Sequence, residues 1–245
     1  MVCWNLDMNK EKFNINIEEM MIAGVQLGHS TSRINPKMQP YLSGVRSGIH
    51  IIDLEKTKEL LSGALEFIQS IVEENKVLLL VGTKIETKAL IKSVAEECGM
   101  PYVSERWLGG TFTNLAAILK RIDYFKEIER KKAAGELEKY TKKERAGIED
   151  EIKKMGIKFG GIKEIKKIPD AIFIADMKEN ELAIREAKQV NVKIIGICDT
   201  NVDPTLADFP IPASDDAVSS LKYILEKVKI AVKSTKPKIK IEKTI

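Results

Sequence analysis

The chain has few of the residues that metal, disulfide and acid–base chemistry require: three cysteines and two histidines among 245 residues. Cys3, Cys98 and Cys198 lie far apart without a CxxC spacing, and their odd number argues against a disulfide framework. His29 and His50 leave little material for a zinc site or a Ser/His/Asp triad. We therefore expect no metal site, no bound cofactor and no catalytic residue.

Long apolar runs are also missing. No segment approaches the roughly 20 consecutive apolar residues that span a membrane, and the first residues lack the apolar stretch of a secretory signal. These absences predict a cytoplasmic protein without a membrane partner. With 44% apolar and 31% charged residues, the chain can bury one large α/β core and still carry an appendage.

The net charge of +4 is small, but the positive charge is segregated along the chain. Residues 118–168 contain 16 Lys and Arg against 10 Asp and Glu, and residues 227–245 contain seven Lys against one Glu. Between His29 and Arg46 there are three basic residues and no acidic one. This distribution favours a polyanionic partner that binds particular faces, although a charged run can also be a solvated surface without a ligand.

Apolar runs alternate with amphipathic segments over most of the chain. Five segments are interpreted as strands of one core sheet: 49–52, 77–82, 101–107, 171–176 and 192–199. Asp53 is placed as the N-cap of the helix after the first strand, and Asp215 or Asp216 as the cap of the last helix, after a loop over 199–217. Strands alternating with helices of ten or more residues predict a parallel sheet that is covered on both faces.

Residues 114–160 interrupt this alternation. Apolar residues recur there by threes and fours, first at Ile118, Ile122 and Phe125 and again around Ile152, within a segment rich in Lys, Arg and Glu. Thr141 and Glu144 have the spacing of a capping box. We predict a projecting coiled-coil hairpin over 114–160, inserted into an α/β domain of residues 1–113 and 161–232, with a basic tail over 233–245.

Two segments leave open the alternative that the chain is an enzyme with the same fold. Thr83 and Lys84 follow a buried strand and open a helix, which suggests a phosphate site, but neither GxxxxGK[ST] nor GxGxxG is present. The Asp-rich stretch from Asp199 to Asp216 can hold Mg²⁺ or act as acid and base, but its spacing fits no EF-hand. A nucleotide- or metal-dependent enzyme would use one of these two segments.

Three longer motifs resemble one known family. GxxxGHxTxxxNPKM followed by GIHIIDLxKT lies within residues 24–57, RWLGGxxTN spans 106–114, and DTNxDPxxxDxPIPxxDDA spans 199–217. These motifs resemble small ribosomal subunit protein two of the bacterial or organellar type, over about residues 17–232. The resemblance implies an α/β, flavodoxin-like (Rossmann-like) five-stranded parallel sheet of order 2-1-3-4-5, with a protruding α-helical coiled-coil hairpin.

The resemblance also implies a function, that of a structural constituent of the small ribosomal subunit in a cytoplasmic or organellar ribosome. The implied partners are small-subunit ribosomal RNA and neighbouring ribosomal proteins, including the S1-type mRNA-binding protein. A free regulatory RNA-binding protein is a further alternative. Gln26 departs from the family, because many members carry histidine there. The residues placed at the RNA by the motifs are His29, Thr31, Arg33, Lys37, Arg46, Arg106, Trp107 and Asn114, and Trp107 has a core aromatic as its alternative role.

Overall fold

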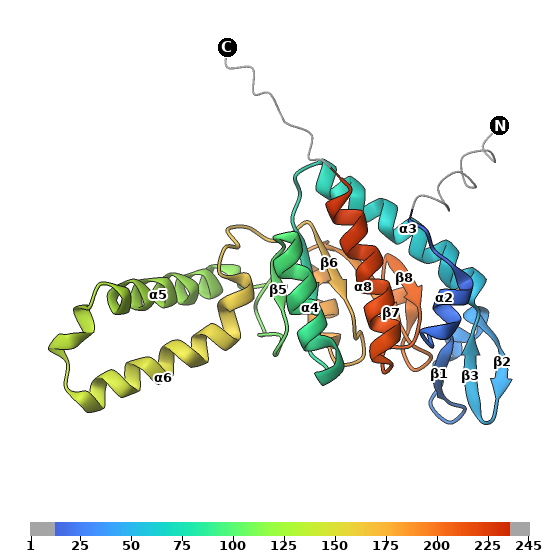
Figure 1. Cartoon of the computed structure of the whole chain (residues 1–245), viewed down its shortest axis with the longest axis horizontal. Helices are drawn as coiled ribbons and strands as arrows, with labels where there is room; N and C mark the ends of the chain where they lie inside the picture. The colour runs from blue at the N-terminus through green and yellow to red at the C-terminus, as the bar shows by residue number, and fades with distance from the viewer. Residues whose placement is uncertain (1–12, 236–245) are drawn as a thin grey trace, which may run out of the picture.

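A five-stranded parallel sheet forms the centre of the molecule in a computed structural model that describes residues 13–235 (Figure 1). The spatial order of its strands is β5-β4-β6-β7-β8, which is 2-1-3-4-5 in chain order, so the strand order implied by the resemblance is confirmed. The strands β4 and β6 are buried at every position, as their continuous apolar sequences require. Their bounds are β4 (Leu78–Val81), β5 (Tyr102–Val103), β6 (Ala171–Ile174), β7 (Lys193–Cys198) and β8 (Phe209–Pro212).

The structure removes the first of the five predicted strands from this sheet and adds a strand after the last of them. The segment Ile49–Ile52 is β3 of a separate antiparallel sheet, where it lies between β1 (Leu27–Ser30) and β2 (Leu42–Arg46). The fifth strand is instead β8, which lies within the predicted loop over 199–217. Two prolines in β8 lack the N–H that a central strand needs, but β8 is an edge strand and tolerates them. The strand predicted over 101–107 is also much shorter, because only Tyr102 and Val103 pair.

Helices cover both faces of the parallel sheet. Met20 of α2 (Ile17–Ile22) belongs to a core on one face with α3 (Leu54–Glu73), α4 (Ile85–Cys98) and α8 (Val218–Lys233), while α7 (Glu181–Gln189) packs on the opposite face. Alternate strand residues supply the two cores, since Leu78 and Leu80 face one and Leu79 and Val81 the other. Among residues 13–235, none of the helices combines the length and apolar character needed to cross a membrane.

Two predicted helix caps can be compared with the structure. The Asp53 side chain accepts a hydrogen bond of 3.0 Å from the Glu55 amide, so this N-cap is confirmed. Neither Asp215 nor Asp216 caps α8, because the N-cap residue is Ala217 and it makes no side-chain capping bond. The two carboxylates are therefore available for contacts across the sheet edge.

The insertion forms an arm of two helices that projects from the body (Figure 1). These helices, α5 (Leu115–Ala133) and α6 (Lys142–Phe159), are joined through the 3-10 turn η2 (Glu136–Lys139), and α6 begins at the predicted Thr141/Glu144 capping box. Phe125 and Phe159 at the base of the arm are buried and belong to the core that also contains α7. The apolar seam therefore continues into the body. The coiled-coil geometry and the division into domains stay predictions.

Candidate functional site

Two of the sequence motifs meet at the carboxyl edge of the parallel sheet, although they lie about 170 residues apart in the chain. The amide of His29 donates to Thr200 Oγ1 at 3.0 Å, and the amide of Asn35 donates to the Thr200 carbonyl at 2.8 Å. A Cβ atom on Gly28 would collide with Thr200 Cγ2. Only glycine at position 28 lets β1 approach the segment after β7 this closely.

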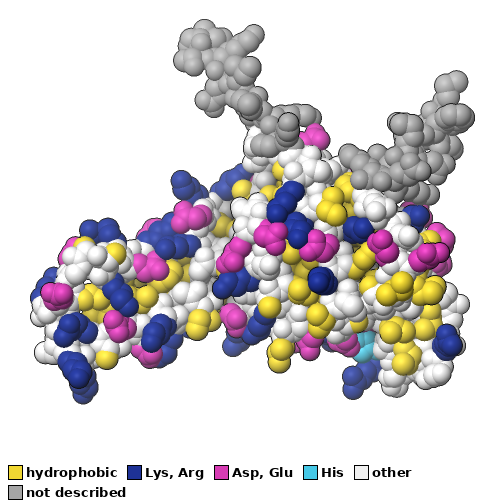
Figure 2. All heavy atoms as spheres, viewed as in Figure 1, with side chains coloured by type: hydrophobic (Ala, Val, Ile, Leu, Met, Phe, Trp, Pro, Cys, Tyr) yellow, Lys and Arg dark blue, Asp and Glu magenta, His cyan; other side chains and the backbone are white. Residues whose placement is uncertain are grey.

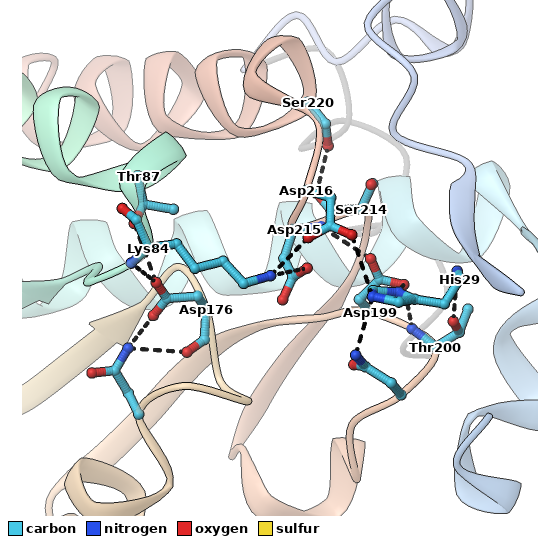
Figure 3. A network of polar contacts seen from close by, with 12 residues as sticks. His29, Lys84, Thr87, Asp176, Asp199, Thr200, Ser214, Asp215, Asp216 and Ser220 are labelled. Carbon is cyan, nitrogen blue, oxygen red and sulfur yellow. Dashed lines mark hydrogen bonds and ion pairs between the residues drawn. The ribbon is translucent and has the colours of Figure 1, made fainter. Parts of the chain in front are cut away.

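His29 faces carboxylates more than solvent, since its side chain is only 12% exposed. Its Nδ1 lies 3.1 Å from Asp199 Oδ1 and its Nε2 lies 3.3 Å from Asp216 Oδ2 (Figure 3). The contact with Asp199 raises the pKa of His29, and this effect outweighs the lowering caused by burial. The imidazole thus joins β1 to the ends of β7 and β8.

Lys84 crosses the same edge from the start of α4. Its Nζ lies 2.7 Å from Asp215 Oδ1 and 2.8 Å from Asp216 Oδ1 (Figure 3). Asp215 is fully buried, and burial raises its pKa to about 6 despite the nearby ammonium. Burial alone would lower the pKa of Lys84, but its hydrogen bonds to the two carboxylates raise it above the usual value. Lys84 is therefore an internal counter-ion and does not face solvent as a phosphate ligand would.

Asp176 fills the position between β4 and β6 at which this topology ordinarily receives a ligand. One of its oxygens accepts hydrogen bonds from the amides of Thr83, at 2.9 Å, and Lys84, at 2.7 Å, and from the Thr87 hydroxyl at 3.2 Å. Burial raises the pKa of Asp176, against the effect of these hydrogen bonds. Amides at a helix N-terminus are the donors that would bind a phosphate, and here a carboxylate of the chain already accepts from them.

Within residues 13–235, one group of side chains has the composition of a metal site. The ligand atoms of His29, Asp199, Asp215 and Asp216 lie within 4.8 Å of one another. Imidazole and carboxylate donors suit Zn²⁺ and related cations. However, the ammonium of Lys84 already bonds to two of the three carboxylates, so the chain itself supplies positive charge to this group.

The basic residues of the opening motif lie on and beside the small antiparallel sheet. Thr31, Arg33 and Arg46 are exposed, and the amide of Thr31 donates to the carbonyl of Gly48 at the β2–β3 turn. Lys37 is also exposed, but its Nζ lies 2.7 Å from Asp203 Oδ2. The structure thus brings Thr31 close to the β2–β3 turn and pairs Lys37 with an acidic partner. RNA binding by these residues stays a prediction.

The second motif divides into buried and exposed residues. Trp107 is only 5% exposed and packs edge-on against Phe112, with 4.9 Å between the ring centroids. Its ring offers no free face on which a base can stack, so the core interpretation replaces the RNA-stacking one. Arg106 and Asn114 are exposed, and Asn114 immediately precedes the arm helix α5. These two residues remain candidates for contact with RNA.

Sequence reasoning missed Glu186, which organises the same motif from α7. Its carboxylate accepts hydrogen bonds from the amides of Gly110 at 2.7 Å, Phe112 at 3.0 Å and Thr113 at 3.4 Å, and the residue is only 4% exposed. Its position in the sequence could have identified it, because Glu186 lies in a helical stripe that also contains Ala183 and Ala187 and is otherwise apolar. An acidic residue on a buried stripe predicts an internal partner.

Comparisons with known proteins agree on one family. The sequence profile described as "Ribosomal protein S2" matches residues 20–235. "Small ribosomal subunit protein uS2" of Coprothermobacter proteolyticus is 41% identical over 218 residues, covering 89% of this chain and 81% of that protein. "Small ribosomal subunit protein uS2c" of Guillardia theta is 43% identical over 214 residues, covering 87% of this chain and 91% of that protein. The protein of the same name from Rhodomonas salina is 42% identical over 214 residues, with 87% and 88% covered.

Proposed function

This chain belongs to the ribosomal protein S2 family, and we propose that it acts as a structural, non-enzymatic component of the small ribosomal subunit that binds ribosomal RNA and neighbouring ribosomal proteins. The non-enzymatic role is supported by the contacts at the sheet edge. There Asp176 accepts hydrogen bonds from the amides at the start of α4, and Lys84 is paired with Asp215 and Asp216. A fold whose ordinary ligand position is filled by its own side chains is suited to assembly.

Co-migration with ribosomal particles tests this function. A tagged copy of the chain is expressed in a bacterial host depleted of its own family member, and the lysate is separated on a sucrose gradient. We expect the tagged chain in the small-subunit peak and in the assembled ribosome. Recovery of the intact, folded chain only at the top of the gradient would contradict the proposal and favour a free RNA-binding protein.

We also propose that the chain helps to recruit the S1-type mRNA-binding protein at the solvent side, between the head and body of the subunit. The support is the sequence resemblance to the family. Small subunits from the depleted strain, with and without the tagged chain, are compared for their content of that protein. An equal content in both preparations would remove this partner from the proposal.

The exposed arginines of the opening motif should contribute to RNA affinity through charge. Each phosphate contact adds about 0.7–0.9 to the slope of log affinity against log salt. Changing Arg33 and Arg46 together to Gln should therefore flatten this slope by about 1.4–1.8. Lys37→Gln should change it by less, because Asp203 already matches the charge of Lys37. A double variant with the wild-type slope on small-subunit RNA would place the interface elsewhere.

We propose that the arm is an insertion whose tip is not needed for folding. Phe125 Cζ would lie 3.7 Å from a Cβ on Gly156, and Lys132 pairs with Glu149 at 3.3 Å, so residues 129 and 152 stand opposite one another. Replacing residues 130–151 by four glycines should keep the melting temperature within a few degrees, because the arm base retains its buried residues. Loss of cooperative melting in circular dichroism would show that the tip belongs to the folding unit.

A further inference from the structure

Two hollows meet where the arm joins the body, and Gly161 lines both of them. A Cβ atom on Gly161 would collide with the Tyr102 carbonyl, so the re-entering chain lies directly against the edge strand β5. The first hollow, of about 500 Å³, is lined by Lys92, Tyr102, Lys153 and Lys158 among others. The second, of about 550 Å³, is lined by Met100, Ile165, Lys166 and Lys167 among others. We call the two together the arm-base groove.

Positive charge is concentrated in the segment 152–168, which ends the insertion, re-enters the body and lines this groove. Residues 152–168 contain six lysines and one glutamate, whereas the arm tip over 130–151 contains seven basic and six acidic residues. Figure 2 shows basic side chains on the arm and at its junction with the body, interspersed with acidic ones in both places. The surplus of positive charge thus lies at the base of the arm, beside the sheet.

Ion pairs cancel only part of this surplus, because Lys154, Lys163 and Lys167 are paired with Asp150, Glu129 and Asp170. The acidic residues of the groove, Glu105 and Glu164, are matched by Lys88 at 2.7 Å and Lys126 at 3.2 Å, neither of which lines it. Lys153, Lys158 and Lys166 are exposed and have no ion pair within residues 13–235. Three lysines on two adjoining hollows are therefore left without a counter-ion.

We propose that the arm-base groove binds the phosphodiester backbone of an RNA strand, with Lys153, Lys158 and Lys166 contacting successive phosphates. This inference rests on the proposed function and names one surface that carries it out. Unpaired lysines on a concave surface track a polyanion. Ile157, which lines the first hollow and is 62% exposed, provides apolar surface for a ribose or base.

The test compares two triple variants of the full-length chain that carry the same net charge. The groove variant changes Lys153, Lys158 and Lys166 to Gln. The control variant makes the same change at Lys131, Lys132 and Lys154, which are paired with Glu127, Glu149 and Asp150. Affinity for small-subunit RNA is measured from 50 to 300 mM KCl. The groove variant should flatten the salt slope by about 2–3, at 0.7–0.9 for each phosphate contact, and the control by less than about 1.

Equal slopes for the two variants would overturn the proposal, because net charge alone would then explain RNA binding. A second measurement uses the wild-type chain in assembled small subunits. The three groove lysines should resist acetylation, and nuclease treatment should expose them. If the three lysines still resisted acetylation after complete RNA digestion, a protein would cover the groove, and this result would also overturn the proposal. Failure of the wild-type chain to enter small subunits at all would instead contradict the proposed function.

Discussion

Replacing Lys84 by alanine is expected to lower the free energy of unfolding by about 3–5 kcal/mol, because it leaves a buried carboxylate without its partner. The side chain of Lys84 is 16% exposed, and it contacts Asp215, which is fully buried. The second oxygen of Asp215 is buried and has no hydrogen-bond partner within residues 13–235. Loss of the ammonium therefore leaves Asp215 without its main source of charge stabilisation.

Urea unfolding of Lys84→Ala measures this effect, and Lys88→Ala is the matched control. Lys88 lies one turn further along α4 and pairs with the exposed Glu105 at 2.7 Å. A pair at the surface contributes at most about 1 kcal/mol, so the control should stay close to wild type. If Lys84→Ala lost no more stability than Lys88→Ala, Lys84 would act as an ordinary surface lysine.

The loss of stability in Lys84→Ala should also depend on pH. Burial raises the pKa of Asp215 to about 6, above its unfolded value of 3.8, so the folded state binds this proton more tightly than the unfolded state does. Stability is therefore gained as the pH falls through about 6 and lost as it rises. The difference in free energy of unfolding between Lys84→Ala and wild type should therefore shrink from pH 7 to pH 5. If the difference stayed constant over this range, Asp215 would not be its cause.

The sequence predicts caps at three helix starts, and two of them are confirmed, whereas neither Asp215 nor Asp216 caps α8. The Asp53 cap and the Thr141/Glu144 capping box each depend on residues within three positions, and both appear as predicted. The assignment of strands to sheets depends on distant partners. The apolar run Ile49–Ile52 looks like a core strand, but it pairs with β1 and β2, whereas Phe209–Pro212 looks like a loop and closes the sheet. Hydrophobic patterns report burial, and they do not identify the neighbouring strand.

The candidate site shows the same limit. The sequence identified the motifs around His29 and Asp199 but could not show that they touch, because the contact depends on the packing of β1 against the sheet edge. The place of Lys84 at a helix start suggests a phosphate ligand, yet its side chain turns to Asp215. A terminal ammonium can point several ways from one backbone position, and only the folded surroundings select one.

Replacing Glu186 by alanine should lower the free energy of unfolding by a comparable amount, about 3–5 kcal/mol. Three backbone amides, those of Gly110, Phe112 and Thr113, would lose their acceptor, and a buried donor such as that of Phe112 costs about 1–3 kcal/mol when it is left without a partner. Glu181→Ala on the same helix is the control. Glu181 is exposed, and its one ion pair within residues 13–235 is with Lys178 at 3.1 Å, so its loss should cost about 1 kcal/mol or less.

The loss of structure in Glu186→Ala should be greatest in the loop from Gly110 to Asn114, which Glu186 holds and which leads directly into the arm. Gly110 adopts φ +89°, and the loop continues to Asn114, the N-cap residue that immediately precedes α5. Without the carboxylate, we expect hydrogen exchange at Phe112 and Thr113 to accelerate more than exchange in β6, which lies in the centre of the sheet. Glu186→Gln keeps one acceptor oxygen and should recover part of the lost stability. Uniform acceleration over the whole sheet would mean that Glu186 stabilises the fold as a whole and does not specifically hold the arm.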